Sequence, residues 1–470
     1  MFKYLNSITF VLEKLASVTF FSIAIYRSVP IYEYTQLVYF STLFIAFFHA
    51  SIALYTAKLQ AIYLIKKNKV NELGFVNSCR EFLKNGFHSE LGRAFLVMVI
   101  ALPCLLLGIV STDFFGLQKI QSSFAFHAFV TFLVGEFLFQ VTLQHLRFGC
   151  STKTTYYFRL VGLTLKAISL VLGICFEDLV FALLINGILL LSTLAYLFYG
   201  AVSLKRLVNL ARKLNVLAFV KNAFCLGVIG SCATFISGFD RVIVPRLISN
   251  SDKLEVFAQL KFYQGFLGLM VPFVGFWLAP LATAQISSRG LSSSLFTLIN
   301  SLNFYFFVGG FCTIYIFYQY INSESFGFSI AELAIFSFSC SAVLIFNFLS
   351  LVFFNSHPVA VSTVTGLLAA VILSIISIFP SIHSITVASY SLVFGSIMLI
   401  VVLRASSAML FKPLIGVQFV STVLHTYVIY FGVSLNFTII AALCLIFLCV
   451  FLEGALRFRN FRMIVFGGKS

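Results

Sequence analysis

The chain has 470 residues, of which 60% are hydrophobic and only 10% are charged. Soluble domains carry about 25% charged residues, so this composition excludes a soluble protein and predicts an all-α polytopic membrane protein. The formal charge of +16 raises the question of a nucleic-acid partner, but an excess of Lys and Arg in cytoplasmic loops explains such a charge more simply.

A helix needs roughly 20 apolar residues to cross the hydrocarbon core of a bilayer. In chain order, fourteen segments meet this requirement and are predicted to be transmembrane helices: 8–27, 35–56, 93–112, 122–143, 157–175, 179–199, 217–238, 255–279, 295–318, 331–353, 360–379, 385–403, 414–432 and 436–454.

The basic residues between these segments predict the topology. We assume a cytoplasmic N-terminus and count basic residues near the span ends with the adjoining loops. On this basis 23 of the 31 basic residues lie on the cytoplasmic side, five lie outside, and Lys14, Lys166 and Lys261 lie within spans. This asymmetry satisfies the positive-inside rule for an even number of spans with both termini in the cytoplasm. It also explains the net charge without a nucleic-acid partner.

The number and parity of the spans predict two six-helix lobes around a central cavity, because parallel repeats place a site between their halves. The first lobe covers residues 1–200 and the second covers 217–404. A basic cytoplasmic connection, 201–216, joins them. Residues 405–470 add a two-helix hairpin and a basic tail, which gives 12 + 2 helices.

Ionisable residues inside a membrane face a cavity or pair with one another, because an unpaired ion in hydrocarbon is costly. Glu13 and Lys14 are adjacent in the first span, so helical geometry directs their side chains about 100° apart. We expect Lys14, which shares a face with Ser17, to line the cavity. Glu13 either tunes the pKa of Lys14 or packs against another span.

Two further acid and base candidates lie in the fourth and fifth spans. Glu136 and Lys166 both lie roughly 12 Å from the cytoplasmic ends of their helices, given a rise of about 1.5 Å per residue. They either form an ion pair or both line the cavity. Lys166 belongs to a polar and small stripe on its helix that begins at Arg159 and continues through Gly162, Ser169 and Gly173.

In the second lobe, Lys261 begins a similar stripe with Gln264. This stripe either packs against a neighbouring helix or leaves room for a ligand. Asp240 and Arg241 end the seventh span, and from these residues alone we expect an exposed pair that adds little stability.

Catalytic and metal-binding patterns are not apparent in the sequence. The ten cysteines have no metal-ligand spacing, and no cofactor motif is present, so neither a metal nor a cofactor is expected. The predicted outer loops are short. A membrane glycosyltransferase or an O-antigen polymerase is therefore disfavoured, because such enzymes generally hold their acceptors in a large outer loop.

The order of features resembles one known family. Fourteen spans divide after the sixth, residues 240–243 at the end of span seven read Asp-Arg-Val-Ile, and the next span has an early Lys261. This order is similar to that of the polysaccharide flippases, the Wzx-type O-antigen and repeat-unit exporters of the MOP transporter superfamily.

The resemblance implies a flippase that moves an undecaprenyl-pyrophosphate-linked oligosaccharide across the bacterial inner membrane by alternating access, for O-antigen, capsule or exopolysaccharide biosynthesis. It implies cavity cations at Lys14 and Lys261, with which we group Lys166 and Arg241 as substrate-binding candidates. The implied partners are the lipid-linked oligosaccharide, membrane lipids and other polysaccharide-assembly proteins. The protein is expected to be a monomer.

Ion coupling and a second type of transporter stay open. Glu13, Glu136 and Asp240 are the candidates for ion coupling or ion pairing, and the sequence does not choose between Na⁺, H⁺ and no coupling. The alternative function is a MATE-like small-molecule antiporter. Three basic residues against two acidic ones within the spans favour an anionic substrate over the cationic substrates of such antiporters.

Overall fold

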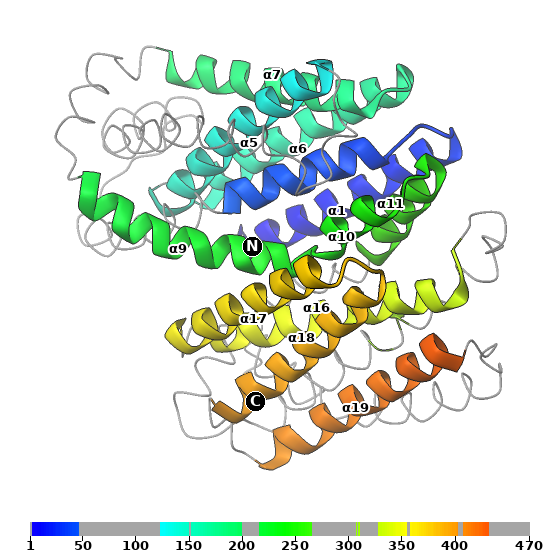
Figure 1. Ribbon diagram of the computed structural model, residues 1–470. Coiled ribbons are helices and arrows are strands. Elements are labelled where there is room, and N and C mark those ends of the chain that lie inside the picture. The colour runs from blue at the N-terminus through cyan, green and yellow to red at the C-terminus, as the bar shows by residue number, and fades with distance from the viewer. Residues whose placement is uncertain are drawn as a thin grey trace, which may run out of the picture. The chain divides into compact units, whose positions relative to one another are not determined.

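The structure is a computed structural model. It describes residues 2–46, 123–149, 152–199, 216–265, 307, 309–310, 328–354, 358–402 and 408–431. All regular elements within these ranges are α-helices (Figure 1). The chain divides into two compact units, Met1–Thr234 and Phe235–Ser470, and the division falls within α9.

The helices of the first unit follow the predicted spans closely. They are α1 (Phe2–Tyr26), a helix over 32–46, α5 (Ser123–Gly149), α6 (Thr152–Cys175), α7 (Leu179–Phe198) and most of α9 (Val216–Ser237). Helix α6 packs between α1 and α7, and α7 also packs against α5.

Helices α5 and α7 approach closely because glycines lie at their crossing. A Cβ atom built on Gly187 would lie 2.7 Å from the carbonyl oxygen of Thr131, and one built on Gly135 would lie 2.9 Å from the carbonyl oxygen of Gly187. Small residues allow such backbone contact between membrane helices. The two helices can therefore pack in a way that larger side chains would prevent.

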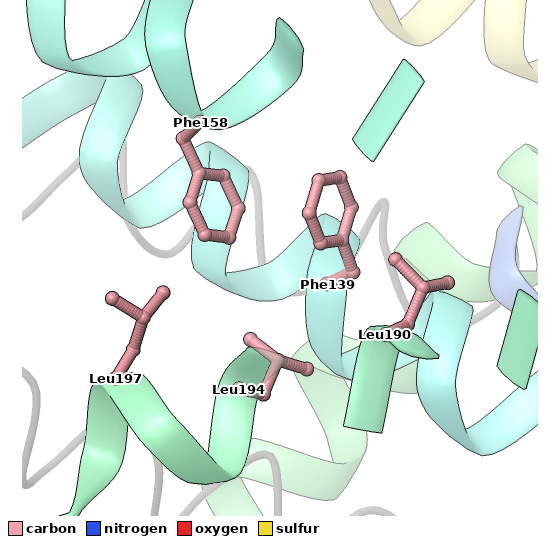
Figure 2. Packing of buried hydrophobic residues seen from close by; sticks show 5 residues of the cluster. All are labelled: Phe139, Phe158, Leu190, Leu194 and Leu197. Atoms are coloured by element: carbon pink, nitrogen blue, oxygen red, sulfur yellow. The ribbon is translucent and has the colours of Figure 1, made fainter. Parts of the chain in front are cut away.

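An aromatic and leucine cluster joins α5, α6 and α7 (Figure 2). The rings of Phe139 and Phe158 stack with their centroids 4.5 Å apart and an interplanar angle of 13°. Leu190, Leu194 and Leu197 of α7 complete the cluster, and their spacing of three and four residues places them on one helix face. This cluster fixes the rotation of α6, and so the direction in which its charged residues point.

The second unit is built around α16 (Ile330–Phe354). Within its candidate span 83% of the residues are buried, against 33% in α17 (Pro358–Ile378), so α16 is central and α17 is peripheral. Helices α18 (His383–Val402) and α19 (Ala408–Phe431) also pack against α16. The short α10 (Asp240–Leu247) and α11 (Ser251–Gly265) precede them in the chain.

Local hydrogen bonds start several of these helices. The side chain of Asn250 accepts from the backbone N–H groups of Asp252 and Lys253 at 2.7 and 3.3 Å and so caps α11. Ser329 and Glu332 form a reciprocal capping box at the start of α16, at 2.7 and 3.2 Å.

Two helices end in a left-handed residue that is not glycine. After α1, Ser28 has φ 57°, and after α6, Glu177 has φ 57°. The N–H of Asp178 then reaches back to the carbonyl of Gly173 at 2.9 Å, and that of Glu177 reaches Ile174 at 3.3 Å. This is the Schellman pattern, in which glycine is the usual left-handed residue.

Five described helices are long and apolar enough to cross a membrane, or six if the bent pair Gly227–Ser237 and Asp240–Leu247 is one span. The predicted all-α membrane character is confirmed at this level. The predicted segments 93–112 and 436–454 lie outside the described residues. So does all of segment 295–318 except residues 307 and 309–310, and all of the basic connection 201–216 except its last residue. The count of fourteen and the cytoplasmic termini therefore stay predictions.

Candidate functional site

A cluster of three charged residues joins α1 and α6 in the first unit. Glu13 lies on α1, and Arg159 and Lys166 lie two helical turns apart on α6. The Glu13 Oε2 atom is 3.5 Å from Arg159 Nη2, and the Oε1 atom is 4.0 Å from Lys166 Nζ. One carboxylate therefore bridges two cations, with one oxygen toward each.

These charges are only partly covered. The side chains of Glu13, Lys166 and Arg159 are 33%, 34% and 20% exposed, although α6 contains the candidate span Thr155–Cys175. A charged group exposed at that depth faces a water-filled volume or a polar headgroup, because contact with hydrocarbon is costly. The three charged side chains are therefore partly accessible and are not part of the hydrophobic core.

Glu136 lies near this cluster on α5. Its Oε1 atom accepts a hydrogen bond of 2.6 Å from Gln140 Nε2, one turn later on the same helix. Glu136 and Lys166 interact electrostatically, but among the described residues the carboxylate within 4.0 Å of Lys166 is that of Glu13. Two roles are predicted for Glu13, to tune the pKa of Lys14 or to pack against another span. In the structure Glu13 contacts another helix, α6, through Arg159 and Lys166.

Lys14 lies on α1, but its side chain is outside the described part of the chain. Ser17, which shares its helix face, donates its hydroxyl to the backbone carbonyl of Glu13 at 2.9 Å. Ser169 of the α6 stripe likewise donates to the carbonyl of Lys166 at 2.8 Å. Both hydroxyls are therefore used within their own helices.

The second unit holds a buried ion pair at a helix break. Helices α9 and α10 meet at an angle of 57° around Gly238, and Asp240 lies in the first turn of α10. Lys261 of α11 pairs with Asp240 Oδ2 and donates to Gln264 Oε1 at 3.0 Å. The ammonium group also lies 5.9 Å from the centroid of the Phe257 ring.

The prediction of an exposed Asp240–Arg241 pair is wrong for Asp240. Its side chain is only 2% exposed, and that of its partner Lys261 is 11% exposed. The physical reason is the helix break, which turns the first residue of α10 inward. Arg241, the next residue, is half-buried.

A buried polar network around His425 was not predicted from the sequence. His425 of α19 is fully buried, with Nδ1 2.7 Å from the carbonyl oxygen of Ser421 and Nε2 3.5 Å from Ser337 Oγ on α16. Ser337 donates to the carbonyl of Gly310 at 2.6 Å. A lone histidine in an apolar segment was the available signal, and the network joins α19 to α16.

The described residues contain no group of three or more His, Cys, Asp or Glu that could hold a metal ion. Comparisons with family models, with curated proteins and with solved structures find no match to this chain. The chemistry of the charged clusters must therefore carry the functional interpretation.

Proposed function

We propose that the chain is a flippase that translocates an undecaprenyl-pyrophosphate-linked oligosaccharide across the bacterial inner membrane by alternating access. The observation that carries the proposal is the partly exposed cluster of Arg159, Lys166 and Glu13 between two apolar helices. It offers two cations to an anionic headgroup within an apolar segment, where charged residues are costly and mark substrate or ion pathways.

The chemistry of this substrate matches such a cluster. A pyrophosphate group carries at least two negative charges and several strong acceptor oxygens, and charge-assisted hydrogen bonds from Arg and Lys are its best partners in a medium of low dielectric constant. The uncharged glycan needs a polar, water-filled volume, while the polyprenyl tail stays in lipid. The headgroup then crosses the membrane without entering hydrocarbon.

The finer architecture belongs to this proposal. We infer fourteen spans, two six-helix lobes around a central cavity and cytoplasmic termini, supported by the distribution of basic residues along the chain. Lys14, Lys261 and Arg241 are proposed to add further cations along the path. The pairing of Lys261 with Asp240 makes its availability depend on that carboxylate.

The proposed protein is a transporter and not an enzyme, so its residues bind and orient rather than catalyse, without a cofactor. One charge moved through 100 mV corresponds to about 2.3 kcal/mol, so coupling to Na⁺ or H⁺ through Glu13, Glu136 or Asp240 would drive transport. The protein is proposed to act as a monomer alongside other polysaccharide-assembly proteins.

Deletion of the gene followed by lipid analysis tests this function. The deletion strain should lose surface glycan and accumulate the lipid-linked repeat unit on the cytoplasmic face, and the wild-type gene should restore both. A strain with normal surface glycan and no accumulated lipid-linked intermediate overturns the proposal. Loss of resistance to cationic drugs with normal glycan would instead favour the antiporter alternative.

A further inference from the structure

The contacts of Glu13 are long for a structural ion pair. Charge-assisted hydrogen bonds between nitrogen and carboxylate oxygen measure about 2.7–2.9 Å, whereas Glu13 lies 3.5 Å from Arg159 and 4.0 Å from Lys166. The carboxylate therefore faces both cations without binding either tightly, and its single charge offsets only one of theirs. About a third of the side chains of Glu13 and Lys166 is exposed, so an incoming ligand can reach them.

The arrangement of the two cations suits a diphosphate group. Each oxygen of Glu13 faces a different cation, so the two cations already converge on one small anion. A diphosphate offers more acceptor oxygens and more charge than a carboxylate. The guanidinium of Arg159 can bind phosphate oxygens bidentately, while the ammonium of Lys166 acts as a point charge.

We propose that Arg159 and Lys166 form a diphosphate clamp and that Glu13 is its internal counter-ion, which the substrate must displace. This inference rests on the proposed function and assigns residues and a mode of control to its headgroup site. In the unloaded protein the single negative charge of Glu13 offsets one of the two positive charges, so the three residues keep a net positive charge that favours an anionic ligand. Binding of the headgroup replaces the carboxylate with an anion of higher charge at the two cations, and the displaced Glu13 side chain, about a third exposed, loses both contacts.

Other charged groups near the clamp define the control. Glu136 interacts electrostatically with Lys166 and with Glu13, and its carboxylate is held by Gln140 on its own helix. Glu13 thus contacts both cations directly, whereas Glu136 acts on Lys166 from a greater distance. Neutralising Glu136 removes a nearby charge while leaving the bridge intact.

Binding of inorganic pyrophosphate to the purified full-length chain in nanodiscs tests the clamp. Calorimetric titrations at one fixed ionic strength compare the wild type with Glu13→Gln, Arg159→Gln, Lys166→Gln and Glu136→Gln. Glu13→Gln should tighten binding by about tenfold, which corresponds to about 1.4 kcal/mol. Arg159→Gln and Lys166→Gln should each weaken it by about tenfold or more. Glu136→Gln should change it by less than about threefold.

Size-exclusion profiles show whether each variant is folded. If Arg159→Gln aggregates, Arg159→Lys replaces it and should bind pyrophosphate more weakly than the wild type, because it keeps the charge but loses the bidentate contact. Equal pyrophosphate affinity in the wild type, Glu13→Gln and Arg159→Gln overturns the clamp and leaves the flippase proposal standing. Absence of binding in both the wild type and Glu13→Gln also overturns the clamp. Failure of the flippase proposal is seen separately, as a deletion strain that accumulates no lipid-linked intermediate.

Discussion

Removing one partner of the Asp240–Lys261 pair should strongly destabilise the second unit. In Asp240→Asn the ammonium of Lys261, whose side chain is only 11% exposed, loses its counter-ion and keeps its hydrogen bond to Gln264. Breaking a buried ion pair in this way costs about 3–5 kcal/mol. Lys261→Met leaves the Asp240 carboxylate unpaired, but the N-terminal end of α10 offsets its charge by about 0.3–1 kcal/mol. We therefore expect Lys261→Met to be the milder change.

The double variant Asp240→Asn/Lys261→Met separates a charge effect from a packing effect. With both charges removed, its loss of stability should be smaller than the sum of the two single losses. For a unit of this size, 1 kcal/mol shifts the unfolding midpoint by about 2–4 °C, so Asp240→Asn should lower the midpoint by about 6–20 °C.

Thermal unfolding of nanodisc samples, followed by fluorescence-detected size exclusion, measures these midpoints. An Asp240→Asn midpoint within about 2 °C of the wild type, or a double variant as unstable as the sum of the single variants, would refute the reasoning. Transport lost in Lys261→Met while the midpoint is retained would assign Lys261 a role in substrate binding instead.

Three further changes test the packing and the turns. Gly187→Ala should destabilise the first unit by about 1–3 kcal/mol, because its Cβ atom would meet the α5 backbone at 2.7 Å. Gly366→Ala, with nothing within 4 Å of its Cβ atom, should be neutral or stabilising. Equal unfolding midpoints for the two variants would contradict the close crossing of α5 and α7. Phe139→Ala removes the stacked ring of Figure 2 and should lower the free energy of unfolding by about 3–5 kcal/mol. A loss below about 1 kcal/mol would show that the cluster is not tightly packed. Glu177→Gly should raise the free energy of unfolding by about 1 kcal/mol, since glycine adopts the left-handed backbone without strain. Glu177→Ala should leave the stability unchanged. A stabilised alanine variant would show that removal of the Glu177 side chain, and not relief of backbone strain, causes the gain.

The sequence predicted the starts and ends of α5, α6 and α7 to within one residue, except that α5 ends six residues later and α6 begins five residues earlier than predicted. The segments 122–143, 157–175 and 179–199 correspond to α5, α6 and α7, because length and hydropathy are properties of a single stretch of chain. The sequence also named Glu13, Lys166, Asp240 and Lys261 as residues needing partners, since charges are rare in such segments.

Only the tertiary structure decided which of these charges meet. The equal depth of Glu136 and Lys166 in their predicted spans suggested an ion pair between them. The rotation of α6 instead brings Lys166 and Arg159 toward Glu13 of α1. The adjacency of Asp240 and Arg241 suggested an exposed pair, but the helix break after Ser237 buries the Asp240 carboxylate against Lys261.

The physical reason is that hydropathy fixes where a helix crosses the membrane but not how it is rotated or which helix is its neighbour. In the first unit, the aromatic cluster and the close contact of Gly187 with α5 fix these properties for α5, α6 and α7. Both depend on residues far apart in sequence. The membrane character therefore follows from composition alone, whereas the ion pairs follow from packing.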